Sequence, residues 1–174
     1  MARNFARIDV TIWMDEDFRD LPPEAQHLYF ILWTHPKLSY CGVVDWRPAK
    51  LSSLAGGWSR EDVNRAAGVL SDRLFIVLDA DTEECLIRSW AKHDGLIKEP
   101  RMTVSFVNSY ADVASRTLQG VIVHEARKLR DAQPTLAGWV KPQMVALLTK
   151  HDIDPASLAL APTCLLYTSP SPRD

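Results

Sequence analysis

The sequence predicts a mainly α-helical fold that includes a small β-hairpin, which is a fold of the α+β class. Three observations lead to this prediction. Apolar side chains recur at helical spacing after Pro22 and again after Pro100. The pair Gly56-Gly57 separates two short helical segments. Residues 79–84 are mostly acidic and join two short apolar runs, which is typical of a hairpin turn.

The first elements are an extended segment, a helix and a short strand. Residues 5–13 alternate between two sides, which predicts a half-buried strand or an extended arm. Pro22 and Pro23 suit a first helical turn, and the helix must end before Pro36. Residues 42–44 are expected to form a short strand that pairs with the later hairpin. The helix carries an apolar stripe at i, i+3, i+4, i+7 and i+8: Ala25, Leu28, Tyr29, Leu32 and Trp33.

Two short helices are expected next. The second helix covers residues 48–55, with Leu51 and Leu54 facing inward. The third begins after Ser59, a good N-cap, and Asp62 three residues later is expected as its capping-box partner, a weaker one than Glu. Its inner face is predicted to hold Val63, Ala66, Ala67 and Leu70.

A hairpin and further helices complete the predicted fold. Residues 74–78 and 85–90 are expected to pair across the acidic turn. Helical spacing returns at 101–114, 117–132 and 142–150, and residues 152–162 have the Ala/Pro/Leu composition of a linker. Helix, strand, helix, turn, helix and hairpin is the order of a winged helix-turn-helix. We therefore expect a winged-helix domain over 1–98, a helical extension of two or three helices over 99–151, and the start of a linker over 152–163.

Composition excludes several protein classes. The 174 residues are 47% hydrophobic and 24% charged, which is typical of a globular protein. No apolar run approaches ~18 residues, so neither a transmembrane helix nor a membrane partner is predicted. The N-terminus lacks the apolar core of a secretion signal, and we expect a cytoplasmic location. The three cysteines form no close pair, so no disulfide or zinc framework is predicted, and Cys41 and Cys85 are expected to be buried.

The last residues of the chain have a different origin in our interpretation. Residues 164–174, CLLYTSPSPRD, resemble at every position the translation of a transposon-type sequencing-library adaptor. We therefore exclude this artefactual tail from the fold and the function. The natural chain is expected to run to about Thr163 and to be cut short there. The alternative is a genuine Ser/Pro linker.

Local charge must decide whether the chain binds DNA, because the net charge is only −2. Residues 1–84 carry 9 Lys and Arg against 14 Asp and Glu, a balance of −5, whereas residues 85–163 carry 10 against 7, a balance of +3. The acidic hairpin turn is not expected to lie against phosphate. Such a turn favours DNA contact by the third helix alone, or a protein partner at the hairpin.

The third helix offers the best candidate DNA contacts. Arg60, Asn64 and Arg65 are expected on its outer face, where they would reach base edges and phosphates. The helix N-terminus at Ser59 also suits a phosphate. The alternative is an ordinary solvated helix face. Further backbone contacts are expected from residues on or just before the second helix: Arg47, Lys50, Ser52 and Ser53.

Other basic residues have less specific interpretations. A second group of basic residues follows the hairpin: Arg88, Lys92, Lys98 and Arg101. These residues either contact the DNA backbone or are scattered surface charges. Three cations lie near the C-terminal end of the helix at 117–132: Arg127, Lys128 and Arg130. Their position favours a stabilising interaction with the helix dipole over DNA contact.

Motifs for catalysis are weak, so no enzyme, metal or cofactor is predicted. The dipeptides His93-Asp94 and His151-Asp152 lack the further ligands that a metal phosphohydrolase needs. Ser89 and Lys92 match S-x-x-K, but Ser89 is expected on a strand rather than on a helix. No glycine-rich phosphate loop is found.

Residues 1–138 resemble the N-terminal region of helix-turn-helix replication-initiation or replisome-organiser-type proteins of phages and prophages of high-GC bacteria. The most characteristic segments are LSYCGV at 38–43, DWRP at 45–48 and RSWAKHDG at 88–95. The resemblance implies winged-helix binding of double-stranded DNA in replication initiation, with replication proteins or a second copy as further partners. Two alternatives stay open: a transcriptional regulator, and a protein-interaction module that docks through the acidic hairpin and the apolar helices after Pro100.

Overall fold

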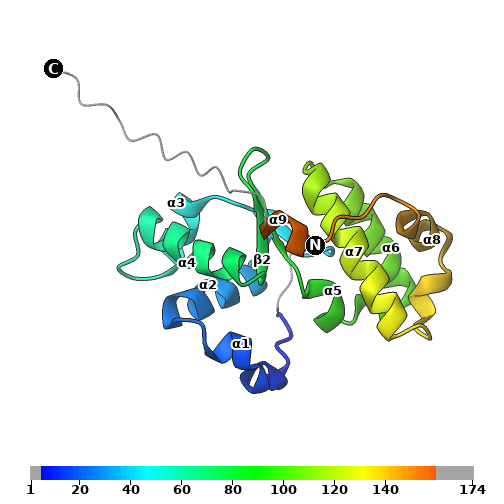
Figure 1. Ribbon diagram of the computed structural model, residues 1–174, viewed down its shortest axis with the longest axis horizontal. Helices are drawn as coiled ribbons and strands as arrows, with labels where there is room; N and C mark the ends of the chain where they lie inside the picture. The colour runs from blue at the N-terminus through cyan, green and yellow to red at the C-terminus, as the bar shows by residue number, and fades with distance from the viewer. Residues whose placement is uncertain (1–4, 160–174) are drawn as a thin grey trace.

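The computed structural model describes residues 5–159, which form a mainly helical α+β fold with one three-stranded antiparallel sheet (Figure 1). The strands are β1 (Val43–Asp45), β2 (Ile76–Asp79) and β3 (Glu84–Ile87), in the order β1–β3–β2. The expected α+β class and the pairing of β1 with the hairpin are confirmed. The expected adaptor-like tail, and the part of the expected linker after residue 159, lie outside the described residues.

Short elements and two longer helices lie on one side of the sheet in Figure 1. The chain starts with a 3₁₀ turn, η1 (Val10–Met14), and the single turn α1 (Glu16–Arg19). The helix α2 (Pro23–Trp33) follows and packs against α4 (Arg60–Asp72). Between them lie α3 (Pro48–Leu51) and the 3₁₀ turn η2 (Ser52–Leu54).

The helices after the hairpin lie on the other side of the sheet (Figure 1). The longest are α6 (Pro100–Ala111) and α7 (Arg116–Ala132), and α8 (Pro142–Leu148) packs against both. The remaining elements are short: α5 (Trp90–His93), η3 (Leu96–Lys98), η4 (Ala137–Val140) and α9 (Pro155–Ala159).

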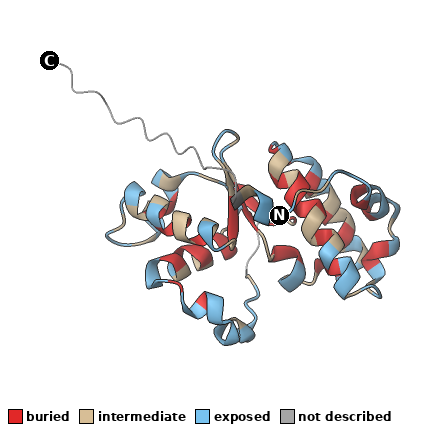
Figure 2. Ribbon diagram, in the orientation of Figure 1, coloured by how far each residue is buried: buried red, intermediate tan, exposed pale blue. Residues whose placement is uncertain are grey.

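The sheet is buried on both faces, because its side chains alternate between two hydrophobic cores. On β3, Cys85 and Ile87 belong to a first core with Leu28 and Leu70 from α2 and α4. Leu86 points to the opposite face and joins a second core that is built mainly by α6, α7 and α8. Figure 2 shows the strands buried between the helices and the outer surface of α3 and of the start of α4 exposed.

Two helices have the inner faces that their spacing predicts. All five residues of the α2 stripe are buried, as are the four predicted inner residues of α4. Leu51 is buried as expected, but the prediction for Leu54 is wrong, because this side chain is 55% exposed. The chain changes from an α-helical to a 3₁₀ turn at Ser52, so the helical spacing of 3.6 residues no longer applies to Leu54.

Two predicted strands differ in the structure. The strand alternative for residues 5–13 is wrong, because these residues do not pair with the sheet: residues 5–9 have no regular secondary structure and residues 10–14 form η1. The return strand ends at Ile87 rather than at Trp90, which instead begins α5. The Trp90 ring is fully buried, packs edge-on against Trp33 at 4.6 Å between centroids, and donates a hydrogen bond to the carbonyl of Tyr40. In the sequence, Trp90 continues the alternation of side chains along the strand, and this pattern alone does not show that the strand ends before Trp90.

The segment with linker composition lies against α7 as far as the structure describes it. The Ile153 N–H donates to the carbonyl of Gly120 at 3.0 Å. A Cβ on Gly120 would lie 2.5 Å from the Ile153 side chain, so only glycine permits this approach. Within residues 5–159, no helix combines the length and the apolar character that crossing a bilayer requires.

Gly42 allows the chain to turn tightly beside Trp90. Its φ is +88°, in the region that favours glycine, and an added Cβ would lie 2.6 Å from the Trp90 Cβ. Gly57 has a similar φ of +78°, but an added Cβ would meet nothing within 4 Å. A comparison of substitutions at the two glycines therefore distinguishes the cost of backbone strain from the cost of steric conflict.

We expect Gly42→Ala to lower the free energy of unfolding by ~3 kcal/mol, because it combines left-handed backbone strain with displacement of Trp90. Gly57→Ala, the matched control, is expected to cost ~1 kcal/mol from backbone strain alone. Urea denaturation of both variants measures the difference. Equal losses in the two variants would contradict the close packing of Trp90 on Gly42.

Candidate nucleic-acid interface

The helix α4 begins at the capping box that its sequence predicts. The Ser59 N–H donates to Asp62 Oδ2 at 2.8 Å, and the Asp62 N–H donates to Ser59 Oγ at 3.2 Å. These two bonds satisfy backbone donors that would otherwise face solvent at the helix start. The Ser59 hydroxyl is itself occupied, because it donates to the same carboxylate at 2.7 Å. The Ser59 side chain therefore holds the helix start and has no hydroxyl proton to offer a phosphate in this conformation.

The outer face of α4 is open. Arg60 is exposed, the Arg65 side chain is 71% exposed, and Asn64 is half-buried between them. In Figure 1, α4 lies on the opposite side of the sheet from α6, α7 and α8, which therefore do not cover it. The structure thus brings the three predicted base-contacting residues together on one accessible helix.

Acidic neighbours offset two of the four candidate cations. Arg65 Nη2 lies 2.9 Å from Asp62 Oδ1, one helical turn away. Arg47 Nη2 lies 3.9 Å from Glu83 Oε2 in the hairpin turn. Arg60 and Lys50 have no acidic partner within 4 Å among residues 5–159. These two side chains therefore carry the positive charge that is free to meet a phosphate.

The two serines of the second helix are less suited to phosphate binding than their sequence suggests. Ser52 Oγ donates to the carbonyl of Ala49 at 3.1 Å, and Ser53 Oγ donates to the carbonyl of Lys50 at 2.7 Å. A phosphate oxygen needs a donor, and both hydroxyl protons are used within the helix. Lys50 is exposed beside them and remains the direct candidate on α3.

Two acids of the hairpin bind the start of α7 instead of facing solvent. Glu84 accepts hydrogen bonds from the backbone N–H groups of Ala114 and Ser115, at 3.0 and 2.7 Å. Asp79 accepts a hydrogen bond from the Ser115 hydroxyl, which itself caps α7. A negative charge is favourable at a helix N-terminus, so these acids join the hairpin to α7. Sequence reasoning missed this role, because the partners are about thirty residues apart.

The second group of basic residues is only partly accessible. Arg88 Nε donates to the carbonyl of Leu74 at 2.6 Å, and Arg88 Nη1 lies 3.2 Å from Glu125 Oε1 on α7. This ion pair is mostly buried, with side-chain exposures of 29% and 15%. Arg88 therefore joins the two halves of the fold and is not available to a DNA backbone. Lys92, Lys98 and Arg101 are exposed.

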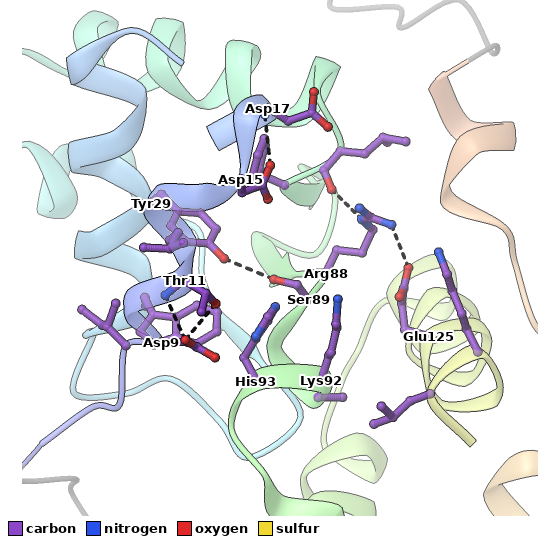
Figure 3. A pocket seen from close by; sticks show the side chains of 18 of the residues that line it. Asp9, Thr11, Asp15, Asp17, Tyr29, Arg88, Ser89, Lys92, His93 and Glu125 are labelled. Atoms are coloured by element: carbon purple, nitrogen blue, oxygen red, sulfur yellow. Dashed lines mark hydrogen bonds and ion pairs between the residues drawn. The ribbon is translucent and has the colours of Figure 1, made fainter. Parts of the chain in front are cut away.

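A cavity of about 500 Å³ opens beside this ion pair, between η1, α2, α5 and α7 (Figure 3). Four carboxylates and four cations line the space, so its formal charge is balanced: Asp9, Asp15, Asp17, Glu125, Arg73, Arg88, Lys92 and Lys128.

Several of the groups that line this cavity have shifted pKa values. Tyr29 and Ser89 share a hydrogen bond of 3.2 Å, and burial raises the pKa of Tyr29 to about 12, so its hydroxyl stays protonated. Figure 3 shows His93 and Lys92 side by side. Partial burial, helped by the charge of Lys92, lowers the pKa of His93. Across residues 5–159, no three His, Cys, Asp or Glu side chains are grouped so that they could hold a metal ion.

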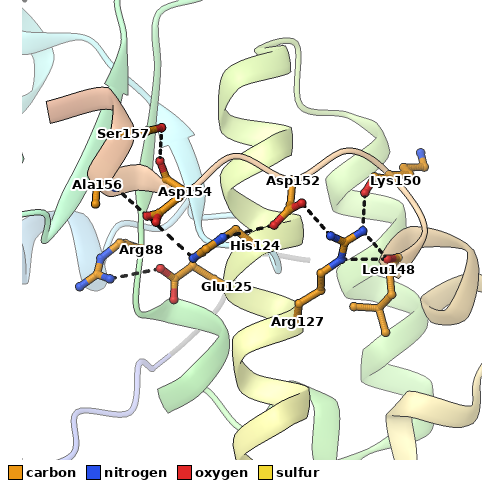
Figure 4. Close-up of polar contacts among 10 residues, drawn as sticks. All are labelled: Arg88, His124, Glu125, Arg127, Leu148, Lys150, Asp152, Asp154, Ala156 and Ser157. Carbon is orange, nitrogen blue, oxygen red and sulfur yellow. Dashed lines mark hydrogen bonds and ion pairs between the residues drawn. The ribbon is translucent and has the colours of Figure 1, made fainter. Parts of the chain in front are cut away.

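Arg127 caps a neighbouring helix rather than its own. Its guanidinium donates to the carbonyls of Leu148 and Lys150, and Nη1 lies 2.7 Å from Asp152 Oδ1 (Figure 4). Leu148 is the last residue of α8, where a cation favourably meets the exposed carbonyls. The Arg127 side chain therefore holds α8 and the following segment on α7.

Comparisons of the chain with models of protein families, with curated proteins and with solved structures find no match.

The capping carboxylate of α4 gives a pH-dependent prediction. Hydrogen bonds from the Ser59 N–H and hydroxyl, together with Arg65, lower the pKa of Asp62 from its ordinary 3.8. Ionised Asp62 therefore stabilises the fold above pH ~4, and this contribution is lost as the pH falls through the lowered value. We expect Asp62→Asn to be less stable than the wild type at pH 7 and nearly equal to it in strong acid.

Urea denaturation across this pH range measures the effect. Asp72→Asn, at the opposite end of the same helix, is the matched control and should show no such loss at pH 7. A constant difference between the wild type and Asp62→Asn from neutral pH to strong acid would contradict the role of the ionised cap.

Proposed function

We propose that this chain binds double-stranded DNA through α4, as a winged helix-turn-helix in which α4 is the recognition helix and β2–β3 is the wing. The observation that carries this proposal is the open face of α4. Its apolar side is buried on the sheet, its start is capped, and its arginines point to solvent. A rigid, exposed helix with cations and an amide has the size and chemistry to read a major groove.

The contacts divide into two groups. Arg60 and Asn64 are proposed to reach base edges, since arginine pairs with guanine and asparagine with adenine. Lys50 and Arg47 are proposed to hold phosphates that flank the groove. Arg65 is bound to Asp62, so its guanidinium must either turn from that carboxylate to a phosphate or contact DNA with its remaining donors.

The biological setting follows from the resemblance of residues 1–138 to phage and prophage initiators. We propose that the protein acts in the cytoplasm in initiation of phage or prophage DNA replication. Transcriptional regulation would use the same α4 contacts and is the second candidate. Protein docking on the wing and on the helices after Pro100 is a further candidate. Asp79 and Glu84 bind α7 and the apolar residues of α6 and α7 are largely buried, so such docking would use the exposed hairpin acids Asp81 and Glu83 or the exposed valines of η4 and α8.

We expect the double variant Arg60→Ala/Arg65→Ala to bind a DNA duplex about ten- to a hundred-fold more weakly, since one base-contacting arginine contributes ~1–3 kcal/mol. Both side chains are exposed, so the fold should be retained. Fluorescence anisotropy with a labelled duplex at two salt concentrations measures the loss. The matched control Arg116→Ala/Arg130→Ala removes two exposed cations of α7 and should bind like the wild type. A folded α4 variant with undiminished affinity would refute the assignment.

We expect Glu61→Gln to bind DNA several-fold more tightly at low salt, because it removes a negative charge beside Arg60 without disturbing the capping box. The gain should shrink as salt screens the charge. Glu99→Gln, which removes an exposed carboxylate before α6, is the control and should leave affinity unchanged. The same anisotropy titration tests both variants, and an equal effect of the two substitutions would argue against contact at the start of α4.

A further inference from the structure

An exposed apolar face lies on η1 at the edge of the first core, where one edge of the Trp13 ring packs against Phe18 at 5.6 Å between centroids. Val10 is 79% exposed, Trp13 54% and Met14 80%. Side chains three residues apart in a 3₁₀ turn lie above one another, so Val10 and Trp13 share a face, and Met14 lies next to it. We call these three residues the η1 face. A cluster of large exposed apolar side chains in a folded protein marks a contact surface.

The surroundings of the η1 face are acidic. Residues 9–20 contain five carboxylates and one cation, which is a local charge of −4. The one cation, Arg19, lies 3.8 Å from Glu16 and is therefore already offset. A partner that covers this face must be apolar and basic.

A surface with these properties lies on the same chain, at η4 and α8. Val140 is 80% exposed and Val145 is 50% exposed. Lys141, the half-buried N-cap residue of α8, lies one helical turn before Val145, whose N–H donates to the Lys141 carbonyl at 2.9 Å. Residues 133–150 contain two lysines and no acid. On α8 the buried residues Met144 and Leu147 face the second core, so Val145 projects outward. We call Val140, Lys141 and Val145 the α8 face.

The two faces cannot meet within one molecule. In Figure 1, η1 lies below α1 and α2, whereas α8 lies at the far side of α6 and α7. We propose that copies of this chain associate head to tail, with the η1 face of one copy on the α8 face of the next. Apolar contact between the faces supplies the attraction, and the opposite local charges select the pairing.

Head-to-tail contact leaves one unused face at each end, so association continues into a ring or a chain instead of stopping at a dimer. The uneven charge of the sequence agrees with this polarity, because residues 1–84 carry −5 and residues 85–163 carry +3. Neither face includes α4. The association is therefore independent of the proposed DNA binding, and a failure of one leaves the other standing.

Sedimentation velocity of the full chain over a range of concentrations tests the proposal. Two double variants each remove one face: Val10→Ser/Met14→Ser and Val140→Ser/Val145→Ser. All four side chains are exposed, so the fold should be unaffected. We expect the wild type to pass beyond a dimer as concentration rises, and each variant alone to stay monomeric. Higher salt should weaken the association of the wild type.

The decisive sample is an equimolar mixture of the two variants. Each variant keeps the face that the other lacks, so the mixture should form dimers and no larger species. Leu54→Ser, which removes an exposed apolar side chain from η2, is the matched control and should associate like the wild type. A wild type that stays monomeric at all concentrations would overturn the proposal, and so would variants that remain monomeric when mixed.

Discussion

The structure depends on one strand, β3, which lies in the middle of the sheet and serves two cores at once. Cys85 and Ile87 face the core that α2 and α4 build, and Leu86 faces the core of α6, α7 and α8. Because the sheet separates the two helical layers, α4 buries one side against it and leaves the other side to solvent. The open face of α4 is thus a consequence of the sheet's position and of the apolar stripe that α4 turns toward the sheet.

Polar contacts strengthen the junction between the two layers. Glu84 and Asp79 bind the start of α7, and Arg88 on the strand side pairs with Glu125 in the middle of α7. Three charged residues of the hairpin and its end, together with Glu125 on α7, therefore hold the helical layers together, although each looks like surface charge in the sequence. This arrangement makes a hairpin rich in acids compatible with the proposed DNA binding, because the α7 helix dipole and hydrogen bonds offset part of the charge of the hairpin.

Local signals in the sequence predicted much of the first layer. The capping box of Ser59 and Asp62, the buried stripe of α2 and the inner face of α4 all follow from residues within one or two helical turns. The contacts of Trp90, Glu84 and Arg88 could not be predicted in this way, because their partners are 14 to 50 residues away. The same limit applies to the candidate site. Its exposed arginines were predicted, whereas the pairing of Arg47 with Glu83 appears only in three dimensions.

The central claim is that the exposed side of α4 enters a DNA duplex. The most direct measurement is the mapping of backbone amide chemical shifts by NMR during titration with a short duplex. The account predicts that the perturbed amides cluster from Arg47 to Arg65, on α3 and the first turns of α4, while those of α6, α7 and α8 change little. Perturbations confined to α7 and α8, or none on α4 at saturating DNA, would contradict it.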